Sequence, residues 1–325
     1  MDRRTFVCTL AGGLLTAPLA AKAQQLDRPY RIGMLERTST AVNAANVNAF
    51  RQGLRERGYV EGERFVIDYR SADGRDEQFP ILAAEMVQSK VSLILTRGTP
   101  AALAAKNATA TIPVVFTGVG DPVGQGIVAS LARPGRNVTG LSAAVTEIFP
   151  KRVQLIVELV PKATRLAALF NMSNPALPSQ WREVEQAARS LGVEPHLLDV
   201  RKADDLAPAF DAAVRHRADA LIVGLETLTQ ANQHVIVELA ARRRLPAIYA
   251  SQEFAGGLAV YGVNYPEMYR QAASFVAKIF KGAKPADLPV EEPTKVELVI
   301  NLRTARTLGL TIPQSVLFRA DHVIE

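Results

Sequence analysis

Two segments of this chain follow the same order of strands, helices and loops, displaced from one another by about 130 residues. Each segment alternates short apolar runs, typical of strands, with longer stretches of helical spacing. Residues 31–40 match 165–174, and 54–58 followed by 65–73 match 188–192 followed by 196–204. Residues 91–96 match 218–223, and 112–116 match 245–249. Because each unit is far longer than a solenoid repeat, the pattern predicts two similar lobes with a ligand-binding cleft between them.

Strands that are apolar throughout, each followed by a helix, indicate parallel sheets covered on both faces. We therefore predict an α/β fold of two similar doubly wound parallel-sheet lobes, joined by a hinge of several strands. Lobe 1 is expected to comprise 29–141 and 262–290, and lobe 2 to comprise 142–261 and 291–325. The predicted strands are 30–35, 65–70, 91–96, 112–116, 165–170, 194–200, 219–223, 246–250, 257–262 and 295–301. The predicted helices are 43–57, 76–89, 99–108, 124–131, 179–191, 203–217, 227–244 and 266–280.

The first 23 residues have the pattern of an export signal. Arg3 and Arg4 supply its basic start, 6–20 its apolar stretch, and small residues precede a cleavage site after Ala23. We expect a periplasmic protein, exported by the Sec route or by the twin-arginine route that the arginine pair resembles. The single cysteine, Cys8, lies inside this signal, so the mature chain is expected to hold no disulfide, cysteine nucleophile or cysteine metal site.

The composition is that of a globular protein, with 48% apolar and 22% charged residues. The formal net charge is +6, but basic and acidic residues alternate and the longest basic run is 242–244. That run is typical of a helix C-terminus, where cations meet the negative end of the helix dipole. We expect no nucleic-acid partner, and we expect a monomer.

Polar residues follow the carboxyl ends of the predicted strands in both lobes, which is where parallel α/β sheets bind ligands. Thr99 and Thr227 occupy equivalent positions in the repeat, each at the start of a helix. A helix start suits a carboxylate or another anion, although both threonines can also be plain N-caps. The N-cap interpretation is preferred for Thr227, and both remain open for Thr99. The candidate ligand-binding residues are Thr38, Ser39, Gly98, Thr99, Thr117, Asp121, Asn171, Asn174, Glu226, Thr227, Ser251, Glu253 and Asn264.

Motifs for catalysis and cofactors are missing from the sequence. Gly118 and Gly120 begin a glycine-rich loop, but Val123 stands where a dinucleotide fingerprint has its third glycine, so NAD binding is rejected. The histidines are scattered without metal-ligand spacing. Glu226 and Glu253 form a possible carboxylate pair without an acid or base partner. We therefore predict no cofactor, no metal, no catalytic residue and no enzyme activity.

Several motifs, in order along the chain, resemble the ABC-transporter substrate-binding proteins of the tryptophan/tyrosine-type uptake family. The motifs are GL at 53–54, GYVEG at 58–62, TPA at 99–101, TIPVVF at 111–116, DP at 121–122, LARPG at 131–135, NVTG at 137–140, GAKPADLP at 282–289, NLRTARTLG at 301–309, IPQS at 312–315 and RAD at 319–321. The resemblance covers nearly the whole mature chain and implies the type I periplasmic binding protein architecture.

The resemblance also implies a function: capture of a small polar or carboxylate-bearing solute by hinge closure, for an ABC permease and its ATPase. It maps ligand contacts onto Thr38 and Ser39, the helix start at Thr99, the loop of Thr117 and Asp121, and 171–174. The chain departs from the family at 225–227 and at Asn264, where a carboxylate would hold an amino group. The ligand that the resemblance implies is an amino acid or a related organic acid. The alternatives are a ligand-sensing module for a signalling receptor and an exported enzyme that uses the same cleft.

Overall fold

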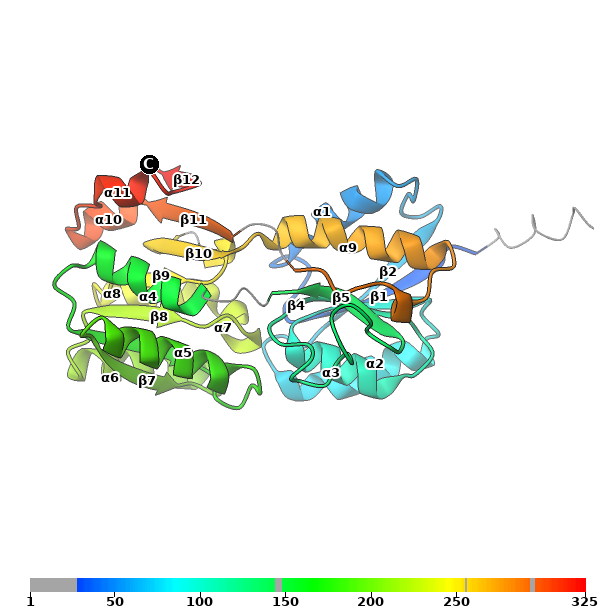
Figure 1. Cartoon of the computed structure of the whole chain (residues 1–325), viewed down its shortest axis with the longest axis horizontal. Helices are drawn as coiled ribbons and strands as arrows, with labels where there is room; N and C mark the ends of the chain where they lie inside the picture. Colours follow the sequence, from blue (N-terminus) through cyan, green and yellow to red (C-terminus); the bar gives the residue numbers. More distant parts are fainter. Residues whose placement is uncertain (1–27, 144–147, 255, 293–295) are drawn as a thin grey trace, which may run out of the picture.

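The protein consists of two α/β lobes that lie side by side along the long axis of the molecule (Figure 1). The structure, a computed structural model, describes residues 28–143, 148–254, 256–292 and 296–325. The predicted export signal, with Cys8, lies outside these residues. Within the described ranges, no helix combines the length and the apolar character that a bilayer span needs.

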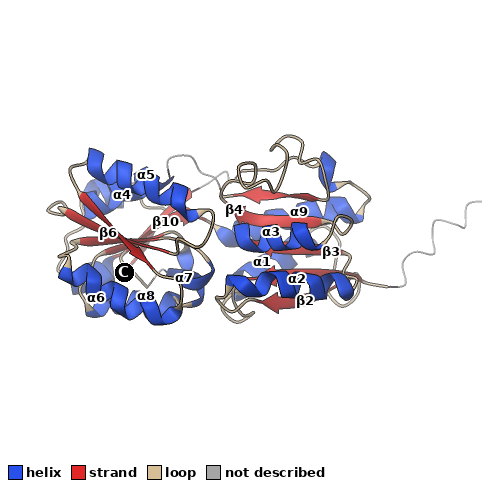
Figure 2. Ribbon diagram, turned by 90° about the horizontal axis from the view of Figure 1, so that it is seen from below, coloured by secondary structure: helices blue, strands red, loops and turns tan. Residues whose placement is uncertain are grey.

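Lobe 1 is built on a five-stranded sheet with the order β2-β1-β3-β4-β5, in which every pairing is parallel. Its strands are apolar because helices cover both faces of the sheet (Figure 2). The strands are β1 (Tyr30–Glu36), β2 (Phe65–Ser71), β3 (Leu93–Arg97), β4 (Val114–Val119) and β5 (Val138–Ser142).

Helices α1 and α9 cover one face of this sheet, and α2 and α3 cover the other. The helix α9 comes from the C-terminal part of the chain and packs along α1 (Figure 1). Gly53 makes this close approach possible, because a Cβ there would lie 2.6 Å from the carbonyl oxygen of Arg270. The helices are α1 (Ala44–Arg55), α2 (Phe79–Gln88), α3 (Thr99–Ala108) and α9 (Tyr265–Phe280), with 3-10 turns η2 (Asp76–Gln78) and η5 (Pro285–Asp287).

Lobe 2 is built on a seven-stranded sheet with the order β12-β11-β10-β9-β8-β6-β7. All its pairings are parallel except that of β10 with β11. The predicted fold class is confirmed, with this antiparallel pair as the one departure from a parallel sheet. The strands are β6 (Arg165–Phe170), β7 (Glu194–Asp199), β8 (Ala220–Val223), β9 (Ala247–Tyr249), β10 (Ala259–Val263), β11 (Val296–Asn301) and β12 (His322–Ile324).

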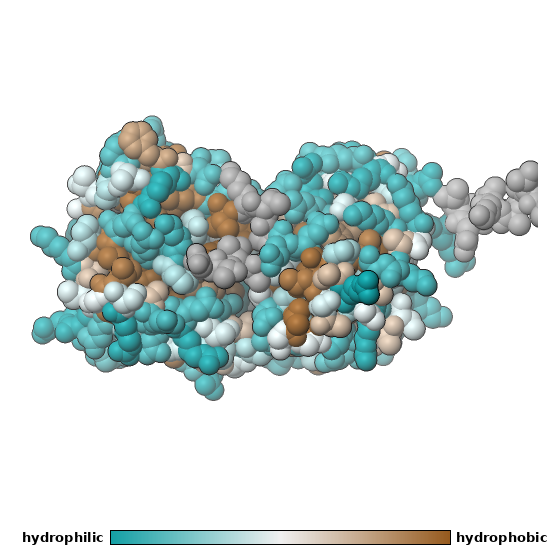
Figure 3. Space-filling model, in the orientation of Figure 1, coloured by the Kyte–Doolittle hydropathy of each residue, from teal (hydrophilic) through white to brown (hydrophobic). Residues whose placement is uncertain are grey.

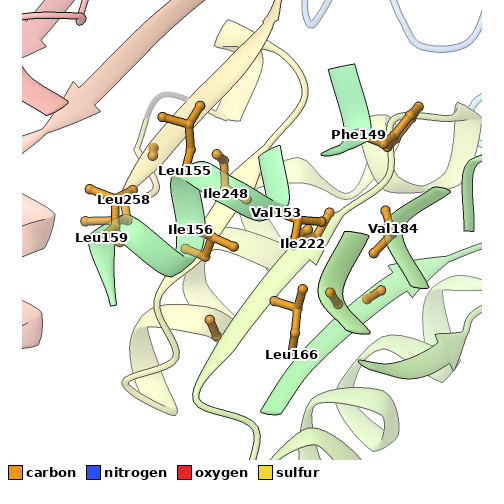
Figure 4. Close-up of a cluster of buried hydrophobic side chains, with 14 of the residues drawn as sticks. Phe149, Val153, Leu155, Ile156, Leu159, Leu166, Val184, Ile222, Ile248 and Leu258 are labelled. Atoms are coloured by element: carbon orange, nitrogen blue, oxygen red, sulfur yellow. The ribbon is translucent and has the colours of Figure 1, made fainter. Parts of the chain in front are cut away.

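One face of the second sheet packs against α4 and α5 in a cluster of aliphatic and aromatic side chains, which includes Phe149, Ile156 and Leu166 (Figure 4). The other face packs against α6 and α8. The helices are α4 (Ile148–Leu159), α5 (Leu177–Ser190), α6 (Leu206–Arg215), α7 (Thr227–Ala231), α8 (Gln233–Arg242), α10 (Leu302–Leu308) and α11 (Gln314–Leu317), with 3-10 turns η3 (Ala203–Asp205) and η4 (Gln252–Phe254).

The chain passes between the lobes three times: after β5, between β10 and α9, and between η5 and β11. The predicted return to lobe 1 at residue 262 falls inside β10, whose last residue, Val263, still pairs with Val296 of lobe 2. The described connection between β10 and α9 lies in the middle of the molecule, between the two lobes (Figure 1).

Three details of the predicted secondary structure are wrong or incomplete. The predicted helix at 124–131 is a series of turns, because Asp121 accepts the amide of Gly124 and Gly126 takes a left-handed φ of 64°. The predicted helix at 227–244 is broken where the side chain of Asn232 bonds the carbonyl of Leu228 and ends α7. The elements β5, α4, α10, α11 and β12 were not expected.

Candidate ligand-binding site

The carboxyl ends of the strands in lobe 1 face those of lobe 2, and a cavity lies between them. The space-filling view shows largely hydrophilic lobe surfaces separated by a notch along one edge (Figure 3). The cavity has about 610 Å³ of space not filled by protein atoms, part of it open to solvent. The lining residues are Arg37, Thr99, Gly118, Gly120, Ala143, Ile148, Phe149, Arg152, Asn174, Ala176, Leu177, Gln180, Leu225, Ala250, Val263 and Tyr265.

Arg37 follows β1 directly and is only 5% exposed, yet its side chain has no ion pair or hydrogen bond with any described residue. Its Nε and Nη1 are closed off from solvent without a partner. The guanidinium lies against Gly98, where any Cβ would collide with it. Burial raises the pKa values of Glu36, Asp76 and Glu226, and the charge of Arg37 opposes each rise, so Arg37 has acidic neighbours although it bonds to none of them. A buried guanidinium with donors left over can also take an anionic acceptor.

The start of α3 lies beside this guanidinium. Gly98 is the N-cap, with a left-handed φ of 83° that favours glycine, and Thr99 is the first helical residue and lines the cavity. The first helical turn leaves the amides of Thr99 and Ala101 without intrahelical acceptors, while Pro100 has no amide hydrogen. Free amides, the positive end of the helix dipole and a guanidinium together form a site for a carboxylate.

A second buried arginine connects lobe 1 with lobe 2. Arg97, at the end of β3, is fully buried and stacks on the ring of Tyr265, 3.7 Å from the ring centre. Its Nη1 donates to Oε1 of Glu253 in lobe 2 at 2.8 Å, and Asn46 donates to the same oxygen at 3.2 Å. Burial alone would lower the pKa of Arg97, but the charge of Glu253 raises it overall. Arg97 and Glu253 therefore form an ion pair between the lobes.

Glu36, the last residue of β1, is buried beside these arginines. Burial raises its pKa from 4.5 to about 7, although a hydrogen bond of 2.6 Å from the Tyr269 hydroxyl and the charge of Arg97 both act against the rise. The pKa of Tyr269 lies well above its ordinary value, chiefly because of its own burial. A carboxyl group next to the arginines is thus partly protonated near neutral pH.

Lobe 2 supplies the other wall, mainly from α4 and α5. The Nε of Arg152 donates to the carbonyl of Tyr261 at 2.7 Å, and burial lowers the pKa of Arg152 to about 10. Its guanidinium lies 4.8 Å from the ring centre of Phe149, which also lines the cavity. Gln180 and Asn174 add amide groups to this wall. The cavity therefore has a cationic group on each side and both amide and apolar side chains between.

A family model described as ABC transporter substrate binding protein matches residues 32–324. The chain belongs to this family.

The known relatives have the same architecture. The chain is 29% identical over 264 residues to a tyrosine-binding protein of Clostridioides difficile (strain R20291), across 80% of this chain and 75% of that protein. An ABC domain in complex with L-Trp from Streptococcus pneumonia superposes with a TM-score of 0.83 at 27% identity, covering 91% of this chain and 100% of that chain. The ligand-free, open structure of a substrate-binding protein with adhesive properties from Clostridium difficile gives 0.64 at 26% identity, covering 91% and 99%.

Among the predicted site residues, this substrate-binding protein places Thr99 and Asn174 at the cavity wall. Gly98 lies under Arg37, and Glu253 holds Arg97 across the lobe interface. The helix starts at Thr99 and Thr227 are confirmed, but the N-caps are the preceding residues, Gly98 and Glu226, so the interpretation of the threonines as N-caps is wrong.

Other predicted residues of lobe 1 are not at the wall. The carbonyl of Thr38 accepts a hydrogen bond from Tyr69 at 2.6 Å, and Ser39 is exposed. The hydroxyl of Thr117 donates to the carbonyl of Thr96 at 3.1 Å. Asp121 is exposed and bonded within its own turn.

The remaining residues of lobe 2 mainly hold the structure around the cavity. Glu226 accepts from the amides of Leu228 and Thr229 at 2.9 and 2.6 Å, and Asn171 donates to it at 3.3 Å. Burial raises the pKa of Asp76 in lobe 1, and the nearby hydroxyl of Thr227 opposes this rise.

Two further residues from the prediction support the region after β9 and the hinge. Ser251 accepts from the amide of Glu253 at 3.4 Å. Asn264 caps α9 by accepting from the amide of Glu267 at 3.0 Å, and it donates to Glu297 at 3.2 Å.

The sequence analysis missed the charged residues that dominate the site: Arg37, Arg97, Arg152 and Glu36. A usable signal existed for three of them, since Glu36, Arg37 and Arg97 directly end or follow apolar strands. Arg152 had no such signal because its helix, α4, has no counterpart in the first half of the repeat. Among the described residues, no group of His, Cys, Asp and Glu has the geometry of a metal site.

Proposed function

We propose that this substrate-binding protein captures a small carboxylate-bearing solute in the cavity between its lobes and delivers it to an ABC permease and its ATPase. The observation that carries the proposal is the buried Arg37 guanidinium beside the start of α3, which forms no hydrogen bond or ion pair with a described residue. A ligand carboxylate would satisfy the guanidinium and the free amides of Thr99 and Ala101 together.

The curated relative and the pneumococcal structure support this ligand class, because their printed ligands, tyrosine and L-Trp, both carry a carboxylate. A small solute that carries a carboxylate is therefore the ligand class that we propose for this chain.

We further propose that capture proceeds by hinge closure. The chain passes between the lobes three times, and Arg97 reaches Glu253 across the interface at 2.8 Å. The chain superposes better on the L-Trp complex, with a TM-score of 0.83, than on the ligand-free, open structure, with 0.64, although the identities are 27% and 26%. Because the two sequence identities are nearly equal, the difference in TM-score supports a closed arrangement of the lobes in this protein.

Delivery to a permease requires the protein outside the inner membrane. We propose that the chain is exported to the periplasm, is cleaved after Ala23, and acts there as a monomer. Cell fractionation with mass spectrometry of the mature N-terminus, and light scattering of the purified protein, test these three statements separately.

The binding proposal is tested with purified mature protein that has been unfolded and refolded to remove co-purified ligand. Small carboxylates should raise the melting temperature, because a ligand that binds only the folded protein stabilises it. The matching carboxamides should not. Arg37→Gln should weaken carboxylate binding by about 2 kcal/mol, the usual size for a lost hydrogen bond to a charged group.

The matched control is Arg136→Gln, which removes an exposed arginine at the opposite end of the sheet and should leave affinity unchanged. Thermal unfolding without ligand checks that Arg37→Gln is folded, so that a loss of affinity is not a loss of structure. Equal affinity of wild type and Arg37→Gln, or no response to any carboxylate at millimolar concentration, contradicts the proposal.

A further inference from the structure

A second pocket lies in lobe 2, at the edge of the sheet opposite the cavity. The strands β6 and β7 begin at this edge and run toward the cavity, and their first residues, Arg165 and Glu194, are partners in the strand register. The pocket has about 730 Å³ of space not filled by protein atoms, part of it open to solvent. Its charged and titratable lining residues are Arg165, Glu194, His196, Arg215, His216 and Arg217.

Three guanidinium groups line this pocket together with one carboxylate. Arg165 lies 3.5 Å from Glu194 in an exposed ion pair. Arg215 and Arg217 have no ion-pair partner in the part of the chain that the structure describes. Three arginines and one glutamate therefore leave an excess of two positive charges while both histidines are neutral. An excess of one sign of charge in a concave surface attracts ligands of the opposite sign.

The end of helix α6 explains only part of this cluster. Arg215 is the last residue of α6 and His216 is its C-cap, and cations at this end of a helix are favoured by the helix dipole. Arg165 and His196, however, lie on β6 and β7. The cluster is therefore assembled from three elements that meet at one pocket.

The two imidazoles of the pocket lie against one another, with their ring centres 3.9 Å apart. Neither ring has a hydrogen-bond partner among the described residues. Burial and the charge of His216 lower the pKa of His196, while Glu194 opposes this change. Two protonated imidazoles at this distance repel one another, and an anion bound beside them would favour their charged forms.

The other charged groups around the imidazoles come from the same three elements and from the start of β8. The carboxylate of Asp219, just before β8, accepts hydrogen bonds from the amides of Thr164 and Arg165 at 2.8 and 3.0 Å. The groups that face the imidazoles are Arg165, Glu194, Arg215 and Arg217. The single carboxylate among them already has Arg165 as its partner.

We propose that this pocket binds a phosphate group, with the two imidazoles and the two arginines without an ion pair as its donors. Guanidinium groups donate pairs of hydrogen bonds to phosphate oxygens, and a protonated imidazole donates from both ring nitrogens. The phosphate group belongs to a soluble phosphate compound or to a lipid headgroup. The pocket is separate from the cavity between the lobes, so this inference does not depend on the proposed function.

Histidine NMR of the purified mature protein tests where phosphate binds. In a phosphate-free buffer of low ionic strength, inorganic phosphate or pyrophosphate should shift the ring resonances of His196 and His216 until the site is saturated. The resonances of His234 on α8 and His322 on β12, which are exposed in other parts of the protein, should stay unchanged. Equal shifts of all four histidines, or no shift of any, would contradict the proposal.

Substitutions of the two arginines test their part in binding. Arg215→Gln and Arg217→Gln should each weaken pyrophosphate binding by about three- to fivefold, as expected for a solvent-exposed charged contact. The control, Arg136→Gln, removes one exposed positive charge from lobe 1 and should leave the affinity unchanged. Equal losses in all three variants would show that pyrophosphate responds only to the net charge of the protein.

A pH titration with sulfate tests the part of the imidazoles, because sulfate keeps its charge while histidines titrate. The affinity of the wild type should rise by about tenfold between about pH 8 and about pH 5.5, which corresponds to a rise of one unit in the pKa of one histidine on binding. The double variant His196→Gln, His216→Gln should bind sulfate more weakly and without this pH dependence, and thermal unfolding checks that it is folded. A wild-type affinity that does not change with pH would overturn the proposed role of the imidazoles.

Co-sedimentation with vesicles distinguishes the two sources of the phosphate group. Vesicles of phosphatidylglycerol that retain the wild type, release it when pyrophosphate is added, and retain Arg217→Gln less well would identify a lipid headgroup. Vesicles that do not retain the protein, although phosphate shifts His196 and His216, would identify a soluble phosphate compound. Vesicles of phosphatidylcholine are the control for contacts that need no anionic headgroup.

Discussion

At the scale of single residues, the most consequential feature is a group of charged side chains buried where strands end. Glu36, Arg37 and Arg97 lie at the carboxyl ends of β1 and β3 with almost no exposure. Each of them would be solvated in the unfolded chain, so each costs free energy on folding unless a partner compensates. Arg97 has Glu253 and Glu36 has Tyr269, whereas the Nε and Nη1 of Arg37 have no hydrogen-bond partner among the described residues.

The raised pKa of Glu36 predicts a pH dependence of stability. Its pKa is about 7 in the folded protein against an ordinary 4.5, so the folded state keeps a proton that the unfolded state has lost between these values. The stabilisation is complete below the lower value and is lost as the pH rises through the higher one. Between roughly pH 5 and pH 8.5 the free energy of unfolding of the wild type should fall by about 2 kcal/mol relative to Glu36→Gln.

Urea unfolding of both proteins across this range measures the difference, and other titrating groups cancel in the comparison. A difference that does not change with pH would show that Glu36 is ionised in the folded protein throughout.

At the scale of elements, α3 shows how the two ends of one helix carry different roles. Its start, with Gly98 and Thr99, faces the cavity beside Arg37. At its end the hydroxyl of Thr109 accepts from the amides of Thr111 and Ile112 at 3.2 and 3.1 Å, and so holds the turn into β4. One helix thus offers a binding threonine and a structural threonine for comparison.

Replacing Thr99 by valine should change ligand affinity, whereas replacing Thr109 by valine should change stability. Thr99→Val removes a hydroxyl from the cavity wall and should weaken carboxylate binding by about 1–2 kcal/mol, with little change in melting temperature. Thr109→Val should lower the free energy of unfolding by about 1 kcal/mol and leave affinity unchanged. Calorimetry gives the ligand affinity of each variant, and thermal unfolding gives its stability. If Thr99→Val lowers stability but not affinity, Thr99 is structural and the anion site lies elsewhere.

At the scale of the whole molecule, the two lobes are held together by few polar contacts in addition to the connections of the hinge. The Arg97–Glu253 pair is the best buried of these, since Arg97 is fully enclosed and Glu253 is only 15% exposed. Asn46 of lobe 1 also donates to Glu253. The pair therefore helps to hold the two lobes in the arrangement described.

Glu253→Gln should shift the ligand-free protein toward an open arrangement. Removing one partner of a buried pair leaves the other charge uncompensated, which typically costs about 3–5 kcal/mol, and opening would return Arg97 to water. Small-angle scattering should show a larger radius of gyration for Glu253→Gln than for the wild type, and added ligand should reduce the difference. The control, Glu185→Gln, breaks the exposed pair with Arg189 on α5 and should leave the radius unchanged. Identical radii for Glu253→Gln and the wild type would show that this pair does not hold the lobes together.

Much of the fold was predictable because it depends on local patterns. The apolar runs and helical spacings of the two repeats place β6 and α3 at the predicted residues, and most other elements within a few residues. The predictions failed where the chain leaves the repeat, at α4 and β5, and where side chains override spacing, as Asn232 does between α7 and α8. These are places where contacts with distant or neighbouring groups decide the local conformation.

Local sequence patterns were therefore enough to predict the two-lobed α/β architecture and a candidate site at the carboxyl ends of the strands, because parallel sheets leave those ends open to ligands. Which residues line the candidate site depends on how the two lobes meet in space. Glu226 and Asp121 bond to nearby amides, while Arg37 and Arg152 come together from opposite lobes. The physical reason is that the role of a charged side chain depends on which groups surround it once water is excluded, and the meeting of two lobes far apart in sequence sets those surroundings.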